Sequence, residues 1–237
     1  MRTSIGRRQR PLTAGEVLGA AFAALAGLLL LGGPAGAAGR AAPAPRRLPP
    51  FRAVVSPVSR AGLGRSWHPG CPVGASGLRL VSLSFVGFDG SAHRGTIVVN
   101  ATVTDDVVAV FADLYAHRFP LRSMTPAAAF AGSDPASMAA DNTSAFNCRL
   151  AVAAGPPHWS VHAYGEAIDV NTVENPYLEG GQVLPPAGRA YVDRSRYRRG
   201  MAVAGGVLVR AFASVGWLWG GRWTASPDWQ HFSKTGG

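Results

Sequence analysis

Two short stretches of the chain, about sixty residues apart, carry side chains that can bind a metal ion. The first, "SVHAYGEAIDV" (160–170), contains His162 and Asp169, and the second, "DWQHF" (228–232), contains His231. A catalytic zinc ion typically takes three protein ligands and keeps a fourth position open for water. Either motif alone is more often structural, but both together in this order predict a zinc site with His162, Asp169 and His231 as its ligands.

A further carboxylate lies beside the third ligand. Asp228 precedes His231 by three residues and is not needed as a ligand. A metal can bring the pKa of water to roughly 7, so a nearby carboxylate suffices as the base that takes its proton. We therefore expect Asp228 to be the general base of a hydrolytic reaction.

The residues around the first motif indicate how its ligands are positioned. Gly165 allows a reverse turn between His162 and Asp169. The segment 167–170 is typical of a short strand, in which Ile168 and Val170 face the core and Asp169 the opposite side.

The rest of the chain predicts mixed strands and helices. Segments 78–88 and 95–103 are rich in branched apolar residues and indicate a hairpin with its turn near Asp89 and Gly90. Helical periodicity predicts helices over 105–118, with Thr104 as N-cap, and over 201–215, while 125–145 is typical of a loop. Without regular βαβ alternation, we expect the α+β class.

The N-terminal residues predict export. Arginines precede an apolar run of about fifteen residues, 17–31, and small residues follow. The run is short for the roughly twenty residues that span a bilayer. We expect residues 1–38 to be a signal peptide, or else an uncleaved anchor, residues 39–65 a disordered linker rich in Pro, Ala and Arg, and residues 66–237 the folded domain. The location is then extracytoplasmic, secreted or anchored at the surface.

The net charge is +10, almost entirely from arginine. A basic surface favours acidic polymers such as those of cell walls. Nucleic acid is not an expected partner, because no arginine-rich run is interleaved with aromatic residues in the folded part. A membrane is expected as partner only through an uncleaved N-terminal segment.

The two cysteines, Cys71 and Cys148, predict a disulfide, because an isolated pair usually joins in an oxidising compartment. The alternative, a catalytic thiol at Cys148, lacks a His–Asp partner set.

The combined pattern S-x-H-x-x-G-x-A-x-D followed by [ED]-x-x-H-F resembles the zinc D-alanyl-D-alanine carboxypeptidases. That family includes vancomycin-resistance carboxypeptidases, D-Ala-D-Ala dipeptidases and L-alanyl-D-glutamate endopeptidases, and it shares a fold with the hedgehog signalling domain. The resemblance extends to "NTSAFNCR" (142–149) and "GWLWGG" (216–221). It implies a small antiparallel sheet flanked by helices, Zn²⁺ as cofactor and a peptidoglycan stem peptide as substrate.

The resemblance also implies roles for further residues. Arg149 matches the arginine that binds a substrate carbonyl or carboxylate and stabilises the oxyanion, and Ser160 matches a serine that orients substrate or loop. We also expect Tyr164 and Trp229, which stand within the two motifs, to contact substrate. Two departures are Asp228, where many members have Glu, and Glu166, where an uncharged residue is usual.

Three functions remain open at the level of sequence. The first expectation is a monomeric D-Ala-D-Ala carboxypeptidase, and an L-Ala-D-Glu endopeptidase is the near alternative. The third is a non-catalytic, zinc-bound wall-binding module, for which the Asp at position 228 is the support. The tryptophans Trp217, Trp219 and Trp223 fit a packed corner and a wall of the substrate cleft equally well.

Overall fold

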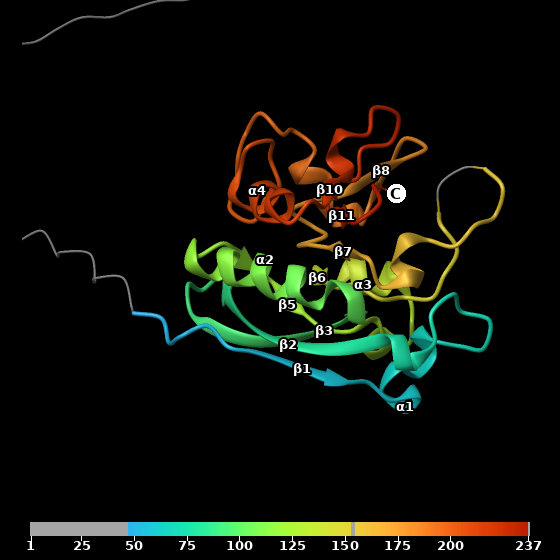
Figure 1. Ribbon diagram of the computed structural model, residues 1–237. Helices are drawn as coiled ribbons and strands as arrows, with labels where there is room; N and C mark the ends of the chain where they lie inside the picture. Colours follow the sequence, from blue (N-terminus) through green and yellow to red (C-terminus); the bar gives the residue numbers. More distant parts are fainter. Residues whose placement is uncertain (1–46, 153–154, 237) are drawn as a thin grey trace, which may run out of the picture. The chain divides into compact units, whose positions relative to one another are not determined.

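The computed structural model describes residues 47–152 and 155–236, which belong to one compact unit, Pro45–Gly237. The predicted signal or anchor, 1–38, and residues 39–46 lie outside the described residues. Within the described ranges, no helix is long and apolar enough to cross a bilayer. The unit is mixed α/β, with several small sheets and few helices (Figure 1).

The largest sheet contains β1 (Ala53–Pro57), β2 (Leu78–Gly87) and β3 (Ala92–Asn100) in antiparallel order. The short strand β4 (Pro120–Leu121) pairs in parallel with the end of β2. The predicted hairpin is confirmed, and Gly90 takes the positive φ of its turn, 75°. The second strand ends earlier than expected, because the side chain of Asn100 caps a 3₁₀ turn over Ala101–Val103.

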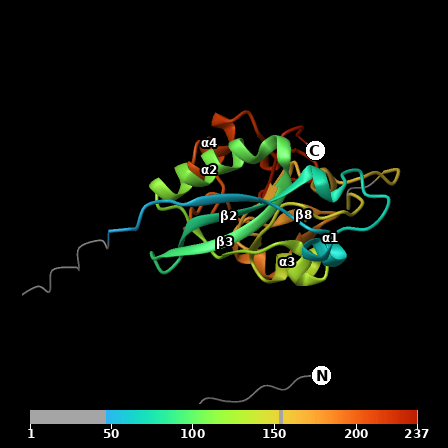
Figure 2. The ribbon, with the colours of Figure 1, turned by 60° about the horizontal axis from the view of Figure 1, so that its bottom comes forward.

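Helix α2 (Thr104–Ala116) covers one face of this sheet and also contacts α4 (Val207–Ser214), as Figures 1 and 2 show. Its predicted apolar stripe is buried in the main core, which also takes in the inward side chains of β2 and β3. The N-cap prediction for Thr104 is wrong: its hydroxyl donates to the carbonyl of Ala101 instead of accepting from the helix.

A second sheet carries two predicted ligands. Its strands are β10 (Leu218–Trp219), β11 (His231–Ser233) and β7 (Ala167–Asp169), all antiparallel. Ile168 and Phe232 are fully buried in the main core, and Phe232 stacks on Phe212 of α4. The predicted alternation around Asp169 is confirmed.

The remaining elements are short. They comprise α1 (Arg60–Leu63), α3 (Asp134–Ala139), the parallel pair β5 (Ser123–Met124) and β6 (Asn142–Thr143), and the hairpin β8 (Tyr177–Glu179) and β9 (Gln182–Leu184). Helix α3 corrects the expected loop over 125–145. The hydroxyl of Ser133 caps it by accepting from the amide of Ala136, with Pro135 in the first turn, where its missing N–H costs nothing.

The linker prediction is wrong for the described residues 47–65. Strand β1 pairs with β2 along five residues, and Leu63 of α1 is fully buried in a second apolar cluster. The phenol of Tyr115 also donates to the carbonyl of Pro49. Backbone pairing and a few buried side chains therefore order a segment whose composition resembles a linker.

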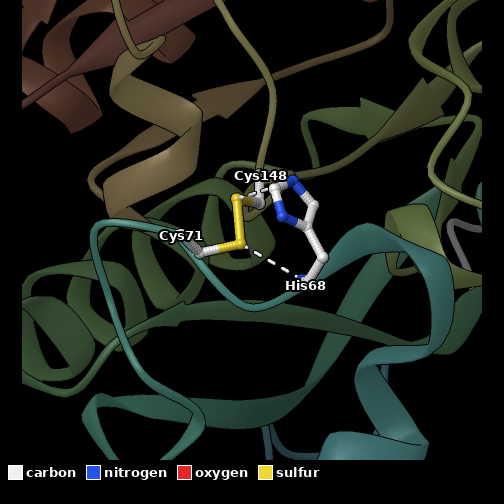
Figure 3. A group of neighbouring side chains, drawn as sticks. All are labelled: His68, Cys71 and Cys148. Atoms are coloured by element: carbon white, nitrogen blue, oxygen red, sulfur yellow. Dashed lines mark hydrogen bonds between the residues drawn. A yellow bond between two sulfur atoms is a disulfide. The ribbon is translucent and has the colours of Figure 1, made fainter.

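The predicted disulfide between Cys71 and Cys148 is confirmed, and it excludes a catalytic thiol at Cys148 (Figure 3). It joins segments 77 residues apart and lies in the second apolar cluster. His68 lies against it, with its amide donating to Sγ of Cys71 and Nε2 3.6 Å from Sγ of Cys148.

Candidate metal centre

The three predicted ligands converge. Nε2 of His162 lies 3.2 Å from Nδ1 of His231 and 3.2 Å from Oδ2 of Asp169. Nδ1 of His231 lies 3.3 Å from Oδ1 of Asp169. Tetrahedral bonds of about 2.0–2.1 Å place ligand atoms about 3.3–3.4 Å apart. Each of these distances therefore has the size that shared coordination of a zinc ion requires, with the two histidines facing different oxygens of Asp169.

Strand pairing positions two of these three ligands. In the β7–β11 register, Asp169 stands directly opposite His231, and Ile168 stands opposite Phe232. Side chains alternate between the faces of a sheet. The pair that fills the core therefore leaves Asp169 and His231 together on the other face.

The third ligand comes from a 3₁₀ turn over Val161–Tyr164. The hydroxyl of Ser160 caps it by accepting from the amide of His162. Gly165 ends the turn with φ 71°, and a Cβ there would lie 2.6 Å from the amide nitrogen of Asn100. The predicted reverse turn therefore requires glycine, both for its conformation and for the close approach to β3.

Hydrogen bonding orients His162 for coordination. Its Nδ1 lies 2.7 Å from the carbonyl of Ala145, which has no proton to give, so Nδ1 carries the proton and donates. In the neutral ring the lone pair then sits on Nε2, the atom that faces the other two ligands. An outer hydrogen bond of this kind is the usual support of a metal-bound histidine.

The cluster is buried and charged. Burial opposes ionisation of Asp169, but the attraction of His162 and hydrogen bonds from both histidines outweigh it and hold the pKa of Asp169 well below its ordinary value. Burial likewise lowers the pKa of His162, but the charge of Asp169 outweighs it and leaves this pKa raised. Oδ1 of Asp169 and Nε2 of His231 have no hydrogen-bond partner in the described part of the chain. A buried polar atom without a hydrogen-bond partner raises the free energy of the folded state. A cation bound by these three side chains would remove this penalty at Asp169.

The cluster opens into a cavity of about 450 Å³. Most of the other lining side chains are apolar, and the polar ones include Asp228, Arg149, Ser160, Asp134, His158, Tyr177 and Gln230. An apolar cavity with few convergent polar groups is the usual form of a small-ligand site.

Asp228 lines this cavity and is only 8% exposed. Burial, and then the negative charge of Asp169, raise the pKa of Asp228 to about 7. Its Oδ1 has no hydrogen-bond partner in the described ranges. A carboxylate with a pKa near neutrality can both accept and return a proton, which is the property that the predicted base requires.

Arg149 lines the same cavity directly after Cys148. Its Nη2 donates to Oδ2 of Asp134 at 2.8 Å, and its Nη1 donates to the carbonyl of Leu150. Its Nε is buried and has no partner among the described residues. The guanidinium group is therefore held in place, and Nη1 and Nη2 each keep one further N–H for a ligand.

Two of the expected substrate contacts, Tyr164 and Trp229, lie outside the cavity lining. Tyr164 does not line the cavity and is 40% exposed. Trp229 also lies outside the lining, buried under the guanidinium of Arg194. Because Trp229 comes between Asp228 and Gln230, which both line the cavity, its side chain turns away. Ser160 does line the cavity, and it orders the turn that carries His162.

The tryptophan cluster divides between the two expectations. Trp217 is buried in the main core, and Trp219 packs against that core. Trp223 lines the cavity, with its ring centroid 5.4 Å from that of His231. The sequence alone did not assign Asp134 or His158 to the cavity. Only the full fold brings α3 and β8 to its rim.

Comparison with known proteins agrees with this geometry. A family model described as D-alanyl-D-alanine carboxypeptidase matches residues 154–234, about one third of the chain. The match supports the M15 peptidase family, whose members are zinc-dependent, and thus a peptidase, without choosing a particular member. Neither the comparison with curated proteins nor that with solved structures gave a match. The hedgehog-like architecture therefore stays a prediction.

Proposed function

We propose that this chain is a zinc metallopeptidase that hydrolyses peptidoglycan stem peptides, acting as a D-alanyl-D-alanine carboxypeptidase. The observation that carries the proposal is the convergence of His162, Asp169 and His231, whose facing nitrogen and oxygen atoms lie 3.2–3.3 Å apart, in the lining of a cavity that also holds Asp228. The family match over the same residues supports it.

In this proposal Nε2 of His162, Nδ1 of His231 and the carboxylate of Asp169 hold the zinc ion. A zinc ion in such a site supplies Lewis-acid polarisation of the scissile carbonyl and makes water more acidic. The buried, unpartnered carboxylate oxygen of Asp169 is the feature of this chain that fits the ion.

The protein's own groups move the proton. Asp228 accepts it from the attacking water and then gives it to the leaving nitrogen, a cycle for which a pKa of about 7 is suited at neutral pH. The N–H groups of Arg149 that are left over by Asp134 and the carbonyl of Leu150 stabilise the negative charge that develops on the carbonyl oxygen. Ser160 holds the turn of His162.

The surroundings agree with a small peptide in an oxidising compartment. Met138, Val161 and Trp223 offer apolar walls for methyl side chains such as those of D-alanine. The Cys71–Cys148 disulfide supports an extracytoplasmic location. We propose that the protein acts as a monomer.

Two other functions are the alternatives to this proposal. An L-Ala-D-Glu endopeptidase would use the same groups and differ in the length of peptide that the cavity accepts. A non-catalytic wall-binding module would keep the metal and lack turnover. The burial of Asp228 within the cavity and its raised pKa favour catalysis over this third reading.

The test is incubation of purified protein with a pentapeptide stem, followed by mass spectrometry and by metal analysis of the same sample. Release of a single D-alanine supports the carboxypeptidase. Cleavage after L-alanine identifies the endopeptidase, and bound zinc without any product identifies the binding module. Absence of zinc from protein purified without chelators contradicts all three.

A further inference from the structure

Asp134 has no role in the reaction described above, yet it forms an ion pair with Arg149 at the cavity wall. Nη2 of Arg149 lies 2.8 Å from Oδ2 of Asp134, and the two side chains are 21% and 17% exposed. Asp134 is the first residue of α3, whereas Arg149 follows β6 and the cysteine of the disulfide. Both side chains line the cavity that holds the metal ligands.

The pair changes what the cavity offers to a substrate carboxylate. Among the described lining residues, Arg149 is the only arginine or lysine. A guanidinium binds a terminal carboxylate strongly through paired, charge-assisted hydrogen bonds. Here the charge of Arg149 is already opposed by a carboxylate at hydrogen-bond distance, so the pair presents no net positive charge.

The hydrogen-bonding capacity of Arg149 is only partly used. An arginine side chain has five N–H donors. One bonds Asp134, another bonds the carbonyl of Leu150, and Nε is buried without a partner in the described part of the chain. Arg149 can therefore still donate to a neutral peptide carbonyl, which needs a donor and no net charge.

We propose that Asp134 is a specificity-determining residue that neutralises Arg149. By this means the cavity accepts peptides that continue beyond the scissile bond as well as peptides that end in a carboxylate there. The inference rests on the proposed peptidase function and deepens it, because it names the substrate class: stem peptides with a free or an extended C-terminus. Asp134 acts through Arg149 and takes no part in proton transfer.

Removing the negative charge of Asp134 should change the affinity only for peptides that end in a carboxylate. In Asp134→Asn the guanidinium would face the cavity uncompensated, and repulsion between Asp134 and a bound carboxylate would be gone. Affinity for a peptide with a terminal carboxylate should rise on the order of tenfold, whereas affinity for the same peptide with a C-terminal amide should hardly change. Asp134→Glu keeps the charge and should behave as the wild type.

The experiment compares N-acetyl-D-Ala-D-Ala with its C-terminal amide on zinc-loaded protein. Calorimetric dissociation constants are measured in an Asp228→Asn background, which prevents turnover, with and without Asp134→Asn or Asp134→Glu. The ratio of kcat/KM for the two peptides is measured in the active proteins. Asp105→Asn serves as the matched control, because it makes the same change in net charge at an exposed position of α2 outside the cavity lining.

The expected result is a ratio of amide to acid dissociation constants that rises about tenfold in Asp134→Asn and in neither Asp134→Glu nor Asp105→Asn. An unchanged ratio, or an equal loss of affinity for both peptides, overturns the inference, and so does failure of both peptides to bind. Binding with the expected ratio but no cleavage by the wild type refutes the proposed function alone, since the affinity readout does not need turnover.

Discussion

Replacing Glu174 by Gln should make the protein more stable in alkaline buffer. The side chain of Glu174 is 1% exposed, and one of its oxygens accepts from Nη2 of Arg122 at 3.3 Å. The other oxygen is buried with no hydrogen-bond partner in the described part of the chain. Burial, and then the neighbouring Asp141, raise the pKa of Glu174 from 4.5 to about 8. The folded protein therefore keeps this carboxyl neutral at pH values at which the unfolded chain has lost the proton.

The direction and size of the effect follow from this difference. An acid whose pKa is higher in the folded state contributes stability that is fully present below pH 4.5, declines above it, and is lost once the pH passes about 8. Each pH unit inside that window is worth about 1.36 kcal/mol. Between about pH 5.5 and 8.5 this one group should reduce the free energy of unfolding by about 3 kcal/mol. Glutamine cannot ionise, and its amide oxygen can still accept from Arg122.

The assay is urea unfolding of wild type and Glu174→Gln at both pH values, with the metal content held equal. Asp228 also has a raised pKa, but it is present in both proteins and cancels in the comparison. The stability lost by the wild type between the two pH values should exceed the loss in the variant by about 3 kcal/mol. Glu166→Gln, at a partly exposed glutamate, is the control for the loss of one negative charge and the gain of an amide.

The reasoning is refuted if Glu174→Gln and the wild type lose the same stability between the two pH values. Equal losses would mean that Glu174 is ionised in the folded protein and that Arg122 compensates its burial. A variant that is less stable than the wild type by the same amount at both pH values would also refute the reasoning. Only a difference in pH dependence between the two proteins reports the protonation of Glu174.

Three other changes have definite expected outcomes. Asp228→Asn should retain zinc by metal analysis and lower kcat by about 10²–10⁴, and normal turnover would remove Asp228 as the base. His231→Ala should lose zinc on dialysis, whereas His158→Ala, in the same cavity but outside the ligand set, should keep it. Reduction of the Cys71–Cys148 disulfide, which joins residues 77 positions apart, should lower the free energy of unfolding by about 4.5 kcal/mol in the chain-entropy view, as measured by denaturation with and without reductant.

Sequence reasoning was most successful where one local rule decides the structure. The alternation of residues around Asp169 predicted which face of the strand its side chain occupies, and the sequence of 160–170 predicted the turn at Gly165. The hairpin of β2 and β3 and the stripe of α2 followed from periodicity. In each case the side chains that fill the core come from one continuous segment with a regular apolar pattern. Core packing and local secondary-structure propensity therefore favour the same structure.

It was less successful where contacts between distant segments decide the structure. Tyr164 and Trp229 stand within the ligand motifs, but the local backbone directs only some side chains of each motif into the cavity, and these two lie outside its lining. Residues 53–57 have the composition of a linker and become a strand because β2 offers an open edge. The residues around Asp134 do not indicate a role for it, because the proposed role depends on Arg149, which belongs to another segment of the chain.

The geometry of the metal centre depends on apolar residues that never touch the metal. A slip of β7 by one residue would turn Asp169 into the core and Ile168 into the cavity. Ile168 and Phe232 are each fully buried, and burying such a side chain is worth about 1.5–3 kcal/mol. The slipped register forfeits the burial of Ile168 and also places a carboxylate among apolar side chains, at a cost of several kcal/mol more. The stacking of Phe232 on Phe212 of α4 fixes the partner strand in the same way. The core thus selects the one register in which Asp169 and His231 meet, and the spacing of the ligands is a consequence of hydrophobic packing that exists before any ion binds.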